Sequence, residues 1–133
     1  MTAATRTILL VDDDVDLTTQ LQVLLEAAGF TVAVAHSEKE GGQVLAEVDP
    51  DLVVVDLMME ENDSGFTFCH HAKAQRPDLP VILLTAVTSE TGIAFDAATE
   101  EERSWIKADA FLDKPVRFER LQAEITRLLG APA

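Results

Sequence analysis

The chain has 133 residues, 47% hydrophobic and 26% charged, and this size and balance predict one soluble globular domain over residues 1–133. The formal net charge of −14 argues against direct nucleic-acid binding, which depends on neutralising phosphates. No apolar run approaches the roughly 20 residues that span a bilayer, no secretion signal is visible, and one cysteine allows no intrachain disulfide, so a cytoplasmic protein without a membrane segment is expected.

Short apolar runs alternate with amphipathic segments along the chain, and this alternation predicts parallel strands connected by helices. The strongest runs are apolar at nearly every position, as in strands that helices cover on both faces. The predicted strands are residues 7–11, 31–35, 52–56, 81–85 and 110–113. The run at 31–35 is less hydrophobic and is therefore expected at an edge of the sheet.

Four helices are predicted from hydrophobic periodicity and from their terminal residues. They span residues 15–28, 38 to about 48, 66–76 and 116–129. The residues expected to face the core from the first helix are Leu17, Leu21, Leu24, Leu25 and Ala28.

Several local signals refine these boundaries. Asp14 is a predicted N-cap of the first helix, and Gly29 is expected to end it. Gly41 and Gly42 lie inside the second helix and cost roughly 1 kcal/mol each relative to Ala, which predicts a weak or mobile helix. Residues 130–133 are expected to fray, which leaves a core of about residues 6–129.

Polar residues stand where the predicted strands end, at the edge where open parallel sheets bind ligands. Asp12 and Asp13 follow the first strand, Asp56 ends the third, Thr85 ends the fourth, and Lys114 follows the fifth. Two like charges ~4 Å apart repel by about 4 kcal/mol at an effective dielectric near 20, so three carboxylates beside one amine must protonate or bind a cation. Oxygen ligands without His or Cys favour Mg²⁺ or Mn²⁺ over zinc.

Such a site suits phosphoryl transfer, which depends on positioning and on neutralising charge. A carboxylate can act as the nucleophile and form an acyl phosphate. The hydroxyl of Thr85 can donate a hydrogen bond to one phosphoryl oxygen, and the amine of Lys114 can pair with another.

Four segments resemble the receiver domains of two-component response regulators, in the same order and over nearly the whole chain. They are residues 8–14 (ILLVDDD), 51–59 (DLVVVDLMM), 81–86 (VILLTA) and 111–115 (FLDKP). The resemblance implies an α/β domain of the (βα)₅ type, a doubly wound, flavodoxin-like three-layer fold whose five parallel strands have the order 2-1-3-4-5.

The resemblance also implies a metal-dependent phosphoacceptor. Asp56 would accept the phosphoryl group, and Asp12 and Asp13 would form the acidic pair that holds the metal together with Asp56. Asp13 would bind the ion directly and Asp12 largely through water, with the backbone carbonyl of Met58 as a further ligand.

Further roles follow from the same resemblance. Thr85 would be the switch hydroxyl, Lys114 the phosphate-binding amine and Phe111 an aromatic rotamer switch. Met58 and Val87 stand two residues beyond Asp56 and Thr85, where relatives influence attack by water, and both are apolar here. We therefore expect a signalling module rather than an enzyme, one that catalyses at most its own phosphorylation and a slow autodephosphorylation.

The implied partners are a sensor histidine kinase or a histidine phosphotransfer protein as phosphodonor, and an unidentified downstream protein. Residues 86–109 are longer than in most relatives, so the homodimer common in the family is left open. No nucleic-acid or membrane partner is expected.

Three other functions are compatible with parts of the pattern. A phosphorylation-independent pseudo-receiver is left open by the unusual segment 86–109. A Mg²⁺-dependent aspartyl phosphohydrolase usually carries a second Asp two residues after the first, where this chain has Met58. A flavodoxin-like cofactor carrier would place phosphate where Asp12–Asp14 repel it. His36, His70 and His71 are interpreted as incidental.

Overall fold

The computed structural model describes residues 6–56, 64–86, 109–114 and 117–129. Five parallel strands form one sheet in the order β2-β1-β3-β4-β5, which confirms the predicted topology. The strands are β1 (Thr7–Val11), β2 (Thr31–Ala35), β3 (Leu52–Asp56), β4 (Val81–Ala86) and β5 (Ala110–Lys114).

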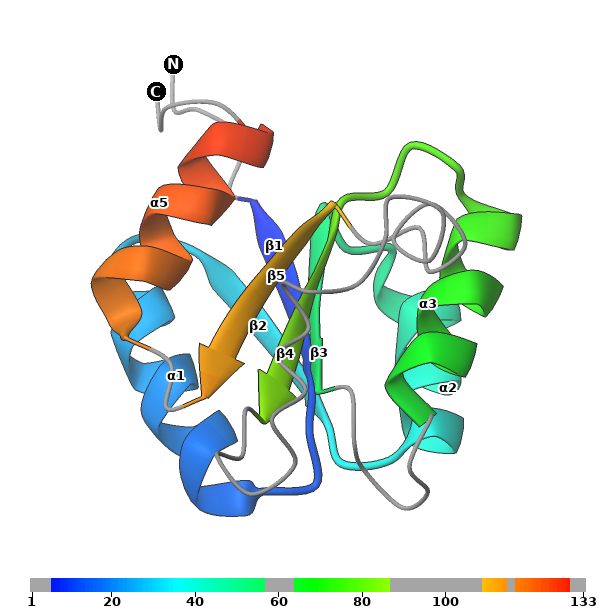
Figure 1. The fold of residues 1–133 in the computed structure, drawn as a ribbon, viewed down its shortest axis with the longest axis horizontal. Helices are drawn as coiled ribbons and strands as arrows, with labels where there is room; N and C mark the ends of the chain where they lie inside the picture. The colour runs from blue at the N-terminus through cyan, green and yellow to red at the C-terminus, as the bar shows by residue number, and fades with distance from the viewer. Residues whose placement is uncertain (1–5, 57–63, 87–108, 115–116, 130–133) are drawn as a thin grey trace.

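Helices cover both faces of the sheet. Within the described ranges they are α1 (Val15–Ala27), α2 (Glu38–Val48), α3 (Ser64–Gln75) and α5 (Phe118–Leu129). Figure 1 shows α1 and α5 on one face and α2 and α3 on the other, so the domain has the expected three layers. The unusual segment 86–109 falls largely at 87–108, outside the described residues.

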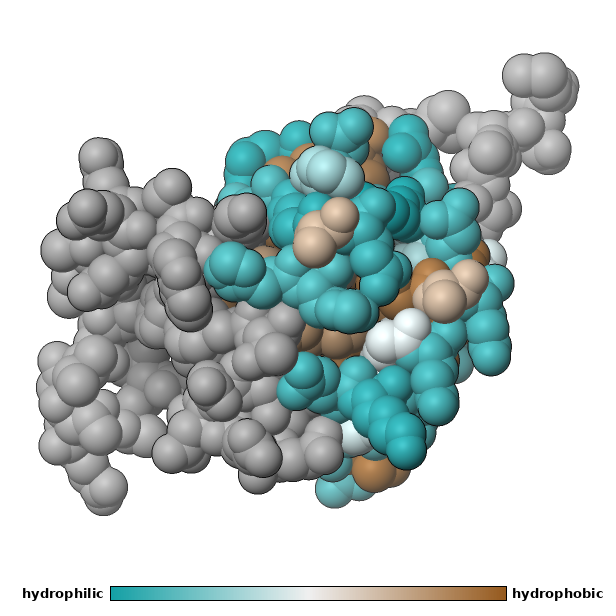
Figure 2. Space-filling view, turned by 90° about the vertical axis from the view of Figure 1, so that its right-hand side faces the viewer, coloured by the Kyte–Doolittle hydropathy of each residue, from teal (hydrophilic) through white to brown (hydrophobic). Residues whose placement is uncertain are grey.

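Alternate residues of the strands fill two separate cores. In β1, Leu9 and Val11 pack toward α2 and α3, whereas Ile8 and Leu10 pack toward α1 and α5. Cys69 of α3 is fully buried in the first of these cores, as expected for a small apolar side chain. Figure 2 views the side formed by α2 and α3, where the described side chains are mostly hydrophilic with small separate hydrophobic areas. No helix among the described residues combines the length and the apolarity needed to cross a bilayer.

The boundaries of α1 agree with the prediction to within one residue. Asp14 is its N-cap and accepts a hydrogen bond from the backbone N–H of Leu17 at 3.1 Å, as predicted. Gly29 follows the helix with φ of 102°, a left-handed conformation that favours glycine. The assignment of Leu24 to the core was wrong: its side chain is 37% exposed, because the buried stripe of α1 runs through Leu21 and Leu25 instead.

The other helices differ slightly from their predicted ranges. α3 begins at Ser64, two residues earlier than expected. α5 begins at Phe118 rather than 116, and its inward face is formed by Leu121 and Ile125, which are fully buried.

The glycines of α2 have different surroundings. A Cβ atom at Gly41 would lie 2.9 Å from Cε2 of Phe68 and 3.1 Å from a methyl carbon of Val11, whereas one at Gly42 would meet nothing within 4 Å. Gly41 therefore allows α2 to approach β1 and α3 closely, and the loss of helix propensity at this position has a packing reason.

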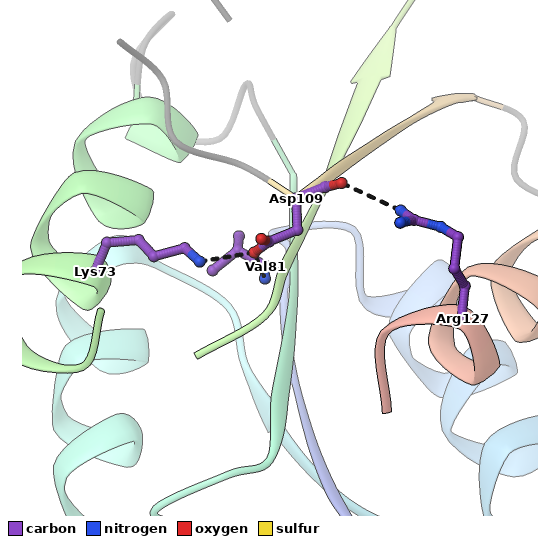
Figure 3. A network of polar contacts seen from close by, with 4 residues as sticks. All are labelled: Lys73, Val81, Asp109 and Arg127. Carbon is purple, nitrogen blue, oxygen red and sulfur yellow. Dashed lines mark hydrogen bonds and ion pairs between the residues drawn. The ribbon is translucent and has the colours of Figure 1, made fainter. Parts of the chain in front are cut away.

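At the amino ends of β4 and β5, a polar network fixes two helices to the sheet (Figure 3). The carboxylate of Asp109 accepts hydrogen bonds from Lys73 Nζ of α3 at 2.7 Å and from the backbone N–H of Val81 at 2.8 Å. Its backbone carbonyl accepts one from Arg127 of α5 at 3.2 Å. Asp109 thus holds helices from both faces at one point.

Candidate functional site

The carboxyl ends of the central strands bring the predicted acidic residues together. Val11 and Val55 are register partners in β1 and β3, so Asp12 and Asp56, which follow them, leave the sheet side by side. This edge lies at the bottom of Figure 1, where β1 turns into α1. Sequence separation is large, but the parallel pairing of β1 with β3 makes the two positions neighbours.

Three carboxylates form a compact group at this edge. One oxygen each of Asp12, Asp13 and Asp56 lies within 4.8 Å of the others. Asp12 and Asp56 are 3% and 4% exposed, whereas Asp13 is exposed, so the group is buried at its base and open to solvent on one side. The predicted gathering of these three side chains is confirmed.

The turn that carries the acidic pair is held by backbone hydrogen bonds. The N–H of Asp12 donates to the carbonyl of Ala35 at the end of β2 at 3.0 Å. The N–H of Asp14 donates to Asp12 Oδ1 at 2.9 Å, which orients that carboxylate. The carboxylate of Asp12 is therefore placed by the chain itself before any ligand arrives.

This donor set fits a divalent cation. All three side chains offer oxygen, and hard cations such as Mg²⁺ prefer oxygen ligands. Three carboxylates at this spacing repel one another, and an ion with two positive charges offsets much of that repulsion. The group could hold a metal ion, and the open side at Asp13 leaves room for further ligands.

Two predicted site residues lie on the neighbouring strands. In β4, Thr85 follows Leu84, which is the register partner of Asp56. In β5, Lys114 pairs with Ala86, so it stands on the same edge but two strands away from β3. The backbone positions agree with the prediction, whereas the functions of these side chains remain predictions, since the structure describes neither side chain.

Of the remaining predicted residues, the structure describes Phe111 but neither Met58 nor Val87. Phe111 is the register partner of Leu83, and its half-buried side chain packs against the core under α2 and α3. Met58 and Val87 lie outside the described residues, so the proposed carbonyl ligand and the effect on dephosphorylation remain predictions.

Comparison with known proteins decides the family. The chain matches the family described as the response regulator receiver domain over residues 8–126. It belongs to that family. The receiver domain is a phosphoacceptor signalling module of two-component systems, in agreement with the resemblance of its four motifs.

Curated relatives and solved structures support this assignment. The receiver domain is 36% identical to the transcriptional regulatory protein ZraR of Escherichia coli K12, covering 92% of this chain and 26% of ZraR. It is 36% identical to the response regulator MprA of Mycobacterium ulcerans, covering 92% of this chain and 49% of MprA. The chain thus spans between a quarter and half of these relatives. A CheY-like receiver domain from Methanospirillum hungatei superposes with a TM-score of 0.79 at 25% identity, covering 95% of this chain and 94% of that one.

One polar contact beside the site was not expected from the sequence. His36 follows β2 directly, and its Nε2 lies 3.2 Å from Oγ1 of Thr18 in α1. His36 was interpreted as incidental because nothing in its sequence neighbourhood indicates a partner 18 residues away. A usable signal was the position of His36 after a strand that neighbours β1.

Proposed function

We propose that Asp56 accepts a phosphoryl group in a reaction that requires Mg²⁺ or Mn²⁺. One observation supports this most strongly: Asp56 is buried at the end of a central strand, with carboxylate oxygens of Asp12 and Asp13 within 4.8 Å. A buried carboxylate that opens on a cation site is protected from bulk water yet reachable from the strand edge. That combination suits a nucleophile whose product is an acyl phosphate.

The proposed step has a simple balance. A carboxylate oxygen of Asp56 attacks the phosphorus atom, and the bond from phosphorus to the donor nitrogen or oxygen breaks. The donor leaves with the bonding electron pair, and the phosphoryl group remains on Asp56. Asp12 and Asp13, with the Met58 carbonyl as a further ligand, would hold the ion, which when bound neutralises charge on the phosphoryl oxygens.

Thr85 and Lys114 complete the proposed site. Their strand positions, one beside the register partner of Asp56 and one on the same edge in β5, support roles as hydrogen-bond donor and cation toward the phosphoryl oxygens. Movement of Thr85 toward the phosphoryl group would then be coupled to Phe111, which packs in the adjacent core. This coupling is the proposed switch of the interaction surface.

The proposed phosphodonor is a sensor histidine kinase or a histidine phosphotransfer protein in the cytoplasm. The output would be a contact with a downstream protein, and a homodimer is one form that it can take. The acidic composition of this chain supports neither a nucleic-acid nor a membrane partner for the domain itself. Turnover of a separate substrate is not proposed.

The test is phosphorylation of the purified protein with acetyl phosphate, with and without MgCl₂. Intact mass spectrometry should show one added phosphoryl group only when Mg²⁺ is present. Asp56→Asn should abolish the addition, and His70→Ala, the control, should retain it. Addition that persists in Asp56→Asn, or that does not need a divalent cation, contradicts the proposal.

A second measurement concerns the lifetime of the acyl phosphate. Neither Met58 nor Val87 can orient water, so the phosphoryl group should be lost slowly after the donor is removed. Met58→Asn should shorten the lifetime, measured by mass spectrometry over time. Rapid loss in the unmodified protein, unaltered by Met58→Asn, contradicts this part.

A further inference from the structure

The β1–α1 turn, which carries Asp12 and Asp13, and the first turns of α1 each make one hydrogen bond to residues at the carboxyl end of β2. One is the backbone hydrogen bond from Asp12 N–H to the carbonyl of Ala35 at 3.0 Å. The other is the contact between Thr18 Oγ1 in α1 and Nε2 of His36 at 3.2 Å. Ala35 is the last residue of β2 and His36 follows it, so both hydrogen bonds reach the carboxyl end of the same strand.

The direction of the hydrogen bond between Thr18 and His36 follows from where the hydroxyl proton of Thr18 is used. Thr18 is 1% exposed, and its hydroxyl donates to the carbonyl of Val15 at 3.0 Å. With that proton used, the hydroxyl oxygen accepts from a protonated Nε2 of His36. The backbone N–H of His36 donates to Glu40 Oε1 at 3.2 Å, so His36 is itself held from the start of α2.

A continuous path of hydrogen bonds connects this contact to a metal-binding carboxylate. The backbone N–H of Thr18 donates to the carbonyl of Asp14 at 3.1 Å, which closes the first turn of α1. The N–H of Asp14 in turn donates to Asp12 Oδ1 at 2.9 Å. A shift of Thr18 therefore acts on Asp14, whose N–H orients the Asp12 carboxylate.

We propose that His36 is a positioning residue for the metal site, which acts by donating a hydrogen bond to Thr18 and so fixing the turn that holds Asp12 and Asp13. This inference rests on the proposed function, because it assumes that the turn binds Mg²⁺. His36 does not act as a ligand itself: within the described ranges, the group of potential metal ligands contains only Asp12, Asp13 and Asp56.

The experiment measures Mg²⁺ affinity of the full chain by isothermal titration calorimetry. His36→Leu and Thr18→Val each remove one side of the contact. Each should weaken Mg²⁺ binding by about three- to tenfold, less than the roughly 10–100-fold loss expected for a direct partner of a ligand, because His36 acts through Thr18 and Asp14. Both substitutions remove the same hydrogen bond. The double variant should therefore have a Mg²⁺ affinity no lower than that of the single variant with the lower affinity. His36→Gln keeps a donor near the place of Nε2 and should restore affinity to within about twofold of the unmodified protein.

Matched controls separate positioning from a general loss of stability. Thr19→Val repeats the Thr-to-Val exchange on the exposed side of α1, and His71→Leu repeats the His-to-Leu exchange on α3. Neither variant should change Mg²⁺ affinity. Urea unfolding of every variant in EDTA measures stability without metal. The inference is overturned if His36→Leu lowers stability but leaves Mg²⁺ affinity unchanged. It is also overturned if His36→Gln fails to restore Mg²⁺ affinity. Absence of Mg²⁺ binding in the unmodified chain would instead overturn the proposed function.

Discussion

The two edges of the sheet differ in how their charged side chains are arranged. At the amino edge, Asp109 pairs with Lys73 at 2.7 Å and caps the N–H of Val81, while Arg76 pairs with Asp49 at 2.8 Å. At the carboxyl edge, three carboxylates lie with oxygens within 4.8 Å of one another. Among the side chains that the structure describes, opposite charges pair at the amino edge, whereas three like charges gather at the carboxyl edge.

This contrast indicates which edge is organised for stability and which for ligand binding. An ion pair such as Lys73–Asp109, whose side chains are 11% and 33% exposed, is complete within the chain. A group of like charges costs free energy in the absence of a cation, and attraction to a bound divalent cation would offset that cost. Substitutions at the two edges should therefore respond to Mg²⁺ in different ways.

The largest effect is expected for Asp13→Asn at the carboxyl edge. The substitution removes a charged ligand, and since loss of a group behind a ligand already costs 10–100-fold in affinity, Mg²⁺ binding should weaken by about 100-fold. Calorimetric titration with MgCl₂ measures this directly. An affinity within about threefold of the unmodified protein would remove Asp13 from the site.

A smaller but metal-independent effect is expected for Asp109→Asn at the amino edge. Lys73, whose side chain is only 11% exposed, would lose its anionic partner, which should lower the free energy of unfolding by about 1–2 kcal/mol. Urea unfolding should give the same loss with and without Mg²⁺. Adding Lys73→Met should recover part of it, and a loss that depends on Mg²⁺ would contradict the separation of the two edges.

Packing beneath the carboxyl edge should matter less than the charges. Gly41→Ala places a Cβ atom 2.9 Å from Phe68 and 3.1 Å from Val11, the residue before Asp12, and should cost about 1–2 kcal/mol of unfolding free energy. Gly42→Ala is the matched control: it meets nothing within 4 Å and should stabilise α2 by about 0.5–1 kcal/mol. Equal effects of the two substitutions would show that helix propensity alone decides.

The smallest effect is expected for Arg127→Gln. Arg127 is exposed, pairs with Glu124 at 2.7 Å and reaches the carbonyl of Asp109 at 3.2 Å, contacts that solvent screens. Unfolding free energy should change by less than about 0.5 kcal/mol. A loss as large as that of Asp109→Asn would mean that Asp109 acts mainly through α5 rather than through Lys73.

The sequence predicted the carboxyl edge better than the amino edge. Apolar runs located every strand, and parallel pairing then places the residues after Val11 and Val55 together without further information. The contact between Lys73 and Asp109 joins residues 36 positions apart and depends on side-chain direction, which periodicity does not contain. The hydrogen bond between His36 and Thr18 also depends on side-chain direction, so it could not be predicted from the sequence either.

Packing distances were also beyond the sequence. Gly41 and Gly42 look alike in the chain, and both were assigned a cost to α2, but only Gly41 lies against Phe68 and Val11. The difference depends on which side of the helix approaches β1. The fold can be predicted from the local sequence pattern. The packing role of Gly41 can be recognised only from the distance between α2 and its neighbours.

The most direct test of the like-charge account is the stability of Asp12→Asn with and without Mg²⁺. The new amide still accepts the hydrogen bond from Asp14, but it removes a buried negative charge from the group. In EDTA, Asp12→Asn should be more stable than the unmodified protein by about 1–2 kcal/mol, because repulsion is relieved. In saturating MgCl₂ the order should reverse, since the unmodified protein binds the ion more tightly. If Asp12→Asn is less stable in EDTA, or if Mg²⁺ leaves the order unchanged, the carboxyl edge is not a group of like charges that a cation offsets.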